Sequence, residues 1–193
     1  MSKQIELEAF YDSLSIAHKL DNFLDEFERR EVHLFAYFSA FLFHYGGHPV
    51  DEWKYKFIID KTGYPHSKQV DDAIDRHINS GAFEMRNNYL SITARGTDEF
   101  NKFSKELSLF KTRENFIDAA CTTAILVPYK ETKMALLLDS NLTTARSLNN
   151  EDWINFEYDN LKLITQSLGA SIDDLTVSAV SWIKILLTTI EDK

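Results

Sequence analysis

The stretch from Val50 to Phe103 constrains the fold more than any other part of the sequence, because its apolar periodicity changes from helical to alternating and back. Between Ser67 and Ser80, apolar residues recur every three or four positions, which places them on one face of an amphipathic helix. Ser67 can cap the start of this helix and Gly81 its end. The residues of the expected inward face are Val70, Ala73, Ile74, His77 and Ile78.

A second helix is expected directly ahead of this one, beginning at Asp51, which is a favourable N-cap residue. Gly63 is followed by Tyr64-Pro65 and ends this helix, so that a tight turn joins the two helices. The apolar residues at helical spacing, which are expected to share a buried face, are Trp53, Phe57 and Ile58.

A short alternating pattern after Gly81 predicts a β-hairpin. The dipeptide Asn87-Asn88 stands at its centre, and asparagine tolerates a positive φ, so a two-residue turn is expected there. A further helix is expected over residues 97–110. The apolar residues of the hairpin are Phe83, Met85, Leu90 and Ile92, and those of the helix are Phe100, Phe103, Leu107 and Phe110.

This order of helix, tight turn, helix, hairpin and helix resembles a winged helix-turn-helix. The step Ile92-Thr93-x-x-Gly96 looks like the exit from the wing in many winged-helix proteins. The resemblance covers about seventy residues and is a pattern at the level of the fold. It implies that residues 67–80 occupy the position of the recognition helix. Because the fold serves both DNA readers and protein-binding modules, the resemblance by itself does not assign a function.

Composition favours a mainly α chain. Six Gly and three Pro among 193 residues indicate short connections, and 44% hydrophobic residues are enough for a core. The predicted fold is a winged helix with extra N- and C-terminal helices. The expected divisions are an N-terminal helical extension over 1–30, a winged-helix domain over 31–110 and a C-terminal helical region over 111–193 that is suited to dimerisation.

The segments ahead of the winged unit are expected to be helical. Residues 2–20 carry an amphipathic pattern, and Asp21-Asn22 can end that helix and begin a second one. The stretch 31–45 is apolar on nearly all sides, so it is expected to be a central helix.

The C-terminal region is expected to contain several more helices. Residues 121–138 favour helix, turn, helix, although the β-branched run ahead of Pro128 keeps a hairpin as the competing interpretation. Residues 141–150 are expected to form a polar loop, and residues 152–168 a helix that buries Trp153 and Leu163.

The last helix, from residue 171 or 172, has an apolar surface wider than one stripe. Such a helix is either deeply buried or part of an oligomer interface. The expected interface residues are Trp182, Ile183 and Leu186.

Three features predict a cytoplasmic protein. Cys121 is the single cysteine and cannot form an internal disulfide, and it is expected to be a buried small residue. Charged residues interrupt the first ten positions, so no signal peptide is expected. No apolar run reaches the length of a membrane span, so no membrane association is expected.

The charge distribution bears on nucleic-acid binding. The chain has a net charge of −9, and residues 31–105 are close to neutral, with nine Lys or Arg against ten Asp or Glu. A surface that binds duplex DNA usually has a clear basic footprint. The expected recognition helix carries three outward aspartates, Asp71, Asp72 and Asp75, which repel phosphates. The residues that could meet DNA are Lys68, Gln69, Arg76, Asn79, Arg86, Asn87, Asn88 and Arg95.

The sequence predicts no catalytic, cofactor or metal site. His44 and His48, with Asp51 and Glu52 nearby, could hold a metal ion. Their spacing crosses a helix end and no Cys pair or H-E-x-x-H motif accompanies them, so ordinary surface histidines are the expectation. No nucleophile elbow or dinucleotide fingerprint is present either, so the protein is not expected to be an enzyme.

Two functions follow from these observations. The first is a non-enzymatic winged-helix interaction protein, acting as a dimer or as the small subunit of a larger complex that handles nucleic acid through its partner. The alternative is a dimeric transcriptional regulator whose winged helices read duplex DNA. The acidic chain and the three aspartates favour the first.

Overall fold

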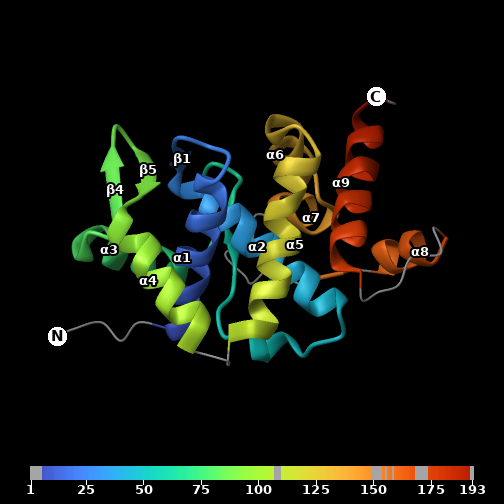
Figure 1. Ribbon diagram of the computed structural model, residues 1–193. Coiled ribbons are helices and arrows are strands. Elements are labelled where there is room, and N and C mark those ends of the chain that lie inside the picture. Colours follow the sequence, from blue (N-terminus) through green and yellow to red (C-terminus); the bar gives the residue numbers. More distant parts are fainter. Residues whose placement is uncertain are drawn as a thin grey trace.

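The structure is a computed structural model that describes residues 6–106, 110–148, 154, 156–157, 159–167 and 174–191. It is mainly helical, as expected, and α2 passes through its centre (Figure 1). The α-helices are α1 Leu7–Asp21, α2 Arg29–Tyr45, α3 Lys68–Ser80, α4 Ala94–Glu106, α5 Lys111–Leu126, α6 Tyr129–Leu137, α7 Ser140–Ser147, α8 Asp159–Ser167 and α9 Leu175–Glu191.

Helix α2 is the centre of the core. Every residue from Glu31 to Tyr45 is buried, which confirms the expectation from its all-round apolar sequence. A capping box begins the helix, because the side chains of Glu28 and Glu31 each accept a backbone N–H from the other's position. Helices α1, α3, α5 and α6 pack around α2, so segments from the whole chain share one core.

A three-stranded antiparallel sheet lies at one end of the molecule, in the order β1-β5-β4 (Figure 1). Strand β1 (Phe27–Glu28) pairs with β5 (Tyr89–Ile92), and β4 (Phe83–Arg86) pairs with the other side of β5. The second helix expected from Asp21-Asn22 is wrong. The chain turns there instead, because Phe27 enters the sheet opposite Leu90 and is fully buried.

The helix and hairpin after residue 67 confirm the sequence pattern. Gly81 has a φ of 76° and ends α3, and Asn87 and Asn88 have φ values of 50° and 71° in the two-residue turn. Thr93 then caps α4, since its Oγ1 accepts the backbone N–H of Gly96 at 3.1 Å. On α3 the fully buried residues are Val70, Ala73, Ile74 and His77, while Ile78 is half-buried.

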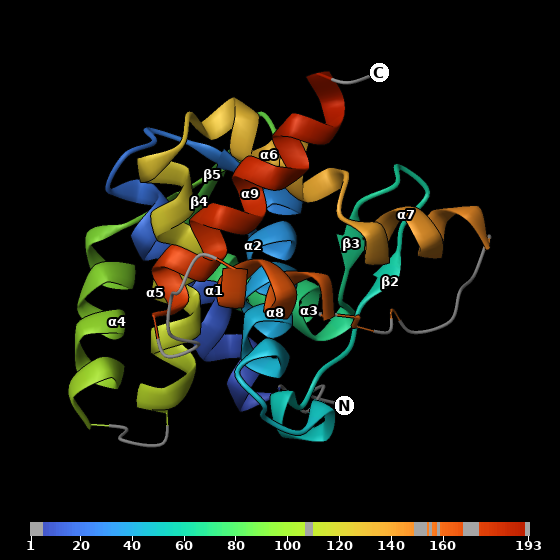
Figure 2. The same cartoon turned by 90° about the vertical axis from the view of Figure 1, so that its right-hand side faces the viewer.

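The α-helix expected from Asp51 is wrong. A 3-10 helix, η1, covers Val50–Trp53, and β2 (Ile58–Ile59) then pairs with β3 (Pro65–His66) in an antiparallel ribbon beside α7 (Figure 2). Lys54 and Lys56 alternate with the buried aromatic residues, which is the period of an extended chain. Helices α2 and α3 are therefore joined by residues 46–67 rather than by a tight turn. The buried aromatic residues of this segment are Trp53, Tyr55 and Phe57.

The C-terminal segment for which both a hairpin and two helices were considered is helical. Residues 121–138 form helix, turn, helix, so the hairpin interpretation is excluded. The polar loop expected over 141–150 is wrong, because Asp139 caps α7 by accepting the backbone N–H of Asn141 at 2.9 Å. Helix α8 begins at Asp159 rather than at 152, and Leu163 is 62% exposed instead of buried. Trp153 lies outside the described residues.

The burial of Cys121 and the apolar character of the helices were both predicted from the sequence. Cys121 is buried, as expected, and burial raises the pKa of its thiol to about 12. Among the described residues, no helix combines the length and the apolar character that crossing a lipid bilayer requires.

A buried carboxylate ties the last helix to the core. Asp139 accepts hydrogen bonds from the Tyr37 hydroxyl at 2.8 Å and from Trp182 Nε1 at 3.1 Å. The Trp182 ring also stacks on Phe41 of α2. The expected interface residues Trp182, Ile183 and Leu186 all have side chains that are buried within the chain itself.

A buried histidine joins α1, α3 and β4. The His77 ring lies between Phe10 and Phe83, with centroid distances of 4.1 and 4.6 Å. Its Nε2–H donates to the Phe10 carbonyl at 3.0 Å, so Nδ1 carries the lone pair of a neutral ring. Burial lowers the pKa of His77 to about 4.

We expect Trp182→Phe to lower the free energy of unfolding by about 2–4 kcal/mol, because it removes a hydrogen bond from a buried carboxylate and leaves a void. Urea unfolding measures the change. Val177→Ala on the same helix is the control, since Val177 is 41% exposed and is expected to cost under about 0.5 kcal/mol. An equal loss in both variants would contradict the core role of Trp182.

We expect His77 to make folding less stable as the pH falls from 6.5 to about 4. His77 of the unfolded chain takes up a proton near pH 6.5, whereas His77 of the folded chain stays neutral down to about pH 4. The contribution of His77 to the free energy of unfolding is therefore fully present above pH 6.5 and is lost as the pH falls from 6.5 to about 4. The loss is about 3 kcal/mol at the rate of about 1.4 kcal/mol per pKa unit. His77→Gln keeps a donor near Nε2 but does not titrate, so its unfolding free energy is expected to change less between these pH values; equal slopes would exclude His77 as the cause.

Candidate functional site

The expected DNA-contacting residues lie on α3, on the hairpin turn and on the first turn of α4, at the end of the molecule that carries the sheet (Figure 1). Nearly all of them are exposed, as the sequence pattern indicates, and Gln69 is half-buried. Asn87 and Asn88 form the tip of the hairpin. The set comprises Lys68, Gln69, Arg76 and Asn79 on α3, Arg86, Asn87 and Asn88 on the hairpin, and Arg95 on α4.

Three of the four cations in this set are bound to carboxylates of their own element. Lys68 Nζ lies 3.2 Å from Asp72, Arg86 Nη2 lies 2.8 Å from Glu84, and Arg95 Nε lies 3.4 Å from Glu99. Within the part of the chain that the structure describes, Arg76 is the member of this set that forms no ion pair. The local charge that phosphates would meet is therefore largely neutralised.

The remaining aspartates of α3 are bound by a cation from outside the predicted set. Arg29, at the start of α2, donates to Asp71 at 2.7 Å and to Asp75 at 2.6 Å. The neighbouring His33 imidazole and the Arg29 guanidinium hold the pKa of Asp71 far below its ordinary value. Arg29 thus fastens α3 to α2 and cancels charge on the exposed face of α3.

His33, His66 and Asp71 come close enough to suggest a metal site, since one ligand atom of each lies within 4.8 Å of the others. The hydrogen bonds of His33 do not fit a metal site. Its Nδ1 accepts the backbone N–H of Ser67 at 3.2 Å, so the single lone pair of the neutral ring is already used. Its Nε2–H then faces Asp71 at 3.7 Å, whereas a metal ligand would need a free lone pair there. The cluster is best explained as a polar link between α2, β3 and α3.

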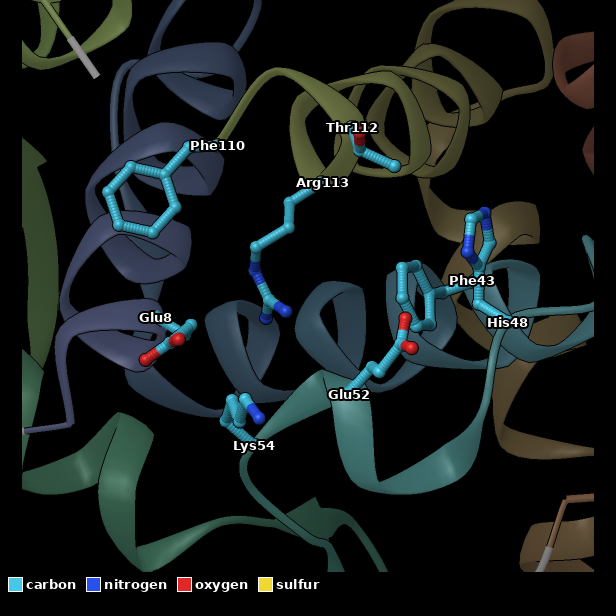
Figure 3. A pocket seen from close by; sticks show the side chains of 8 residues that line it. All are labelled: Glu8, Phe43, His48, Glu52, Lys54, Phe110, Thr112 and Arg113. Atoms are coloured by element: carbon cyan, nitrogen blue, oxygen red, sulfur yellow. The ribbon is translucent and has the colours of Figure 1, made fainter. Parts of the chain in front are cut away.

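A cavity of about 310 Å³ opens between α1, α2, η1 and the start of α5 (Figure 3). Phe43 and Phe110 supply apolar walls. Charges of both signs line the cavity, so its electrostatics do not select a ligand of one charge. The complete lining is Glu8, Phe43, His48, Glu52, Lys54, Phe110, Thr112 and Arg113.

Arg113 at this cavity is held in place by a buried carboxylate. Its Nε donates to Asp12 at 3.0 Å, and its Nη2 binds the second oxygen of the same carboxylate. Tyr55 also donates to Asp12, at 2.6 Å, and the guanidinium lies 3.7 Å from the centre of the Trp53 ring. These contacts explain Arg113 as a structural element that joins α1, η1 and α5.

Neither of the two arginines that organise these sites, Arg29 and Arg113, was predicted from the sequence. Arg29 and Arg113 each stand far along the chain from the carboxylates that they bind, so no local sequence pattern connects them. One signal was available in the sequence: Asp12 lies on the apolar side of the first amphipathic helix, and a carboxylate buried there needs a partner. The structure shows that Asp12 is fully buried.

Comparison with models of known protein families, with curated proteins and with solved structures finds no match to this chain.

We expect Arg29→Met to raise the pKa of Asp71 toward its ordinary value of 3.8, as measured by NMR titration of the carboxyl group. Because the lowered pKa stabilises the fold above that value and the contribution is lost as the pH falls, the variant is also expected to lose up to about 1 kcal/mol at neutral pH. Arg30→Met is the matched control, since Arg30 pairs with Glu28. An Asp71 pKa that is the same in both variants would contradict the assignment.

Proposed function

We propose that this protein is a non-enzymatic interaction protein of the winged-helix type, which acts as a dimer or as the small subunit of a larger assembly that handles nucleic acid through its partner. The arrangement of α3 and the β4–β5 hairpin supports the winged-helix part of the proposal, and β1 adds a third strand to the sheet. The long connection between α2 and α3 departs from a helix-turn-helix, so the proposal rests on the hairpin and α3 rather than on that motif.

The ion pairs on α3, the hairpin and α4 are the observation that favours a protein partner over duplex DNA. The cations that duplex DNA would need on α3 and the hairpin are mostly bound to Asp72, Glu84 and Glu99, and the chain has a net charge of −9. Releasing them toward phosphates would break these ion pairs and leave the carboxylates close to the DNA backbone. Electrostatics therefore favour a protein partner over a nucleic acid.

The exposed apolar residues of the hairpin favour the same partner class. Met85 is 49% exposed and Tyr89 is 43% exposed, on adjacent strands of the sheet. Protein interfaces are enriched in Met and Tyr, whereas phosphate contacts require cations. The hairpin thus offers a protein more contact area than it offers a DNA backbone.

The second candidate remains a dimeric winged-helix regulator that reads duplex DNA. It is favoured by Arg76, which has no ion pair among the described residues, and by the exposed amides of Asn79, Asn87 and Asn88. These side chains can contact base edges or phosphates without breaking an internal salt bridge.

Fluorescence anisotropy of a labelled mixed-sequence duplex separates the two candidates. We expect no binding at low salt, where attraction to phosphates is strongest. Arg76→Ala, Arg86→Ala and the control Lys184→Ala, on exposed α9 surface, are then expected to behave alike. Binding that falls steeply with salt, and that the first two variants weaken while Lys184→Ala does not, would overturn the proposal in favour of the DNA reader.

A further inference from the structure

Strand β4 is the free edge of the three-stranded sheet. Strand β5 lies between β1 and β4, so only one side of β4 is paired. The hairpin projects from the end of the molecule, and none of the elements that the structure describes lies beyond β4 on its open side (Figure 1). An unpaired edge presents backbone N–H and C=O groups that another strand can bind.

The hairpin register determines which backbone groups face outward. Arg86 and Tyr89 close a two-residue turn and therefore form a hydrogen-bonded pair. Such pairs alternate along an antiparallel ladder, so Glu84 also bonds inward to β5 while the backbone of Met85 points to the open edge. Any strand that joins this edge must form its central hydrogen bonds with Met85.

The side chains beside Met85 carry opposite charges. Glu84 and Arg86 lie on one face of β4 and pair with each other at 2.8 Å, and both are exposed. The short sequence Glu-Met-Arg is therefore complementary to itself when it is read in the opposite direction. The Met85 side chain, half exposed on the other face, would meet its own copy at the centre.

We propose that β4 pairs with β4 of a second copy of this chain, antiparallel and about a two-fold axis at Met85. The Met85 N–H of each copy donates to the Met85 carbonyl of the other. Glu84 of one copy then lies opposite Arg86 of the other, on both sides of the axis. The two sheets join into one continuous sheet of six strands.

Charge selects this register over its neighbours. A two-fold axis at Glu84 would set Glu84 against Glu84, and an axis at Arg86 would set Arg86 against Arg86. Like charges directly opposite each other destabilise a strand pair, whereas opposite charges stabilise it. Because β4 has four residues, few hydrogen bonds form, and association is expected to be weak and dependent on protein concentration.

Sedimentation equilibrium of the full chain over a range of concentrations tests the pairing. Glu84→Arg gives two cations on the edge and Arg86→Glu gives two anions, so each variant alone is expected to self-associate about tenfold more weakly than the unchanged chain. The double variant Glu84→Arg with Arg86→Glu restores complementarity and is expected to associate again. An equimolar mixture of the two single variants is expected to form a heterodimer.

Circular dichroism and thermal unfolding of every variant serve as the folding control, since these side chains are exposed. Amide exchange gives a second measurement: the Met85 N–H is expected to exchange more slowly as the concentration rises, while the amides of Glu84 and Arg86, already bonded to β5, do not change. Three outcomes would each overturn the pairing: a monomer at all concentrations, single variants that associate like the unchanged chain, or a mixture of the single variants that does not associate. Each of them would leave the edge of β4 free for another peptide instead.

This inference names the partner of the proposed interaction protein and rests on that proposal. The sedimentation experiment contains no nucleic acid, so its failure removes the β4 pairing and leaves the proposed function open to another partner. Salt-dependent binding of duplex DNA would instead overturn the proposed function itself.

Discussion

The burial of α2 on all sides is the constraint on which the rest of this structure depends. A helix that is apolar around its whole circumference cannot face water along any side, so other elements must cover it completely. Helices α1, α3, α5 and α6 supply that cover, and Trp182 of α9 stacks on Phe41. Because the covering elements come from both ends of the chain, the N- and C-terminal segments complete one core with the central part.

The cover is fastened by a few buried polar groups. Asp139 binds Tyr37 and Trp182, and Asp12 binds Arg113 and Tyr55. Each carboxylate would be costly to bury alone, so its donors must reach it in the correct arrangement of helices. Apolar contacts tolerate many arrangements, whereas these hydrogen bonds fit one, and they therefore specify which helix lies against which side of α2.

The parts of the fold that could be predicted from sequence are those whose signals are local. Helix α3 and the hairpin follow from apolar spacing and from Asn87-Asn88, whose positive φ values the turn requires. The helix predicted from Asp51 was wrong because the spacing of Trp53 and Phe57 fits a helix as well as an alternating strand pattern. The exposed Lys54 and Lys56 were the residues that indicated an extended chain. Helix α7 was missed although Asp139 is a favourable N-cap residue, because the residues that follow it are mostly polar and were interpreted as a loop.

The candidate site was less predictable, because its chemistry depends on contacts between distant residues. The exposed positions on α3 follow from helical periodicity, but their neutralisation by Arg29 requires α2 to lie beside α3. Trp182 was assigned to an interface because the sequence pattern of an apolar residue is the same whether the residue that covers it belongs to the same chain or to another chain. Sequence periodicity indicates that an apolar face is covered, but it does not indicate which element or which chain covers it.

The exposed pair Glu84–Arg86 explains why the proposed pairing of β4 can be specific although this surface offers phosphates little net charge. An exposed ion pair contributes little to stability, so exchanging its partner for the same group on another chain costs little. Phosphates offer only one sign of charge and cannot satisfy both side chains, whereas an antiparallel strand with alternating charges satisfies both at once. In the proposed pairing, the alternation of charge that reduces attraction to phosphates is therefore also the feature that selects one strand register at the open edge of β4.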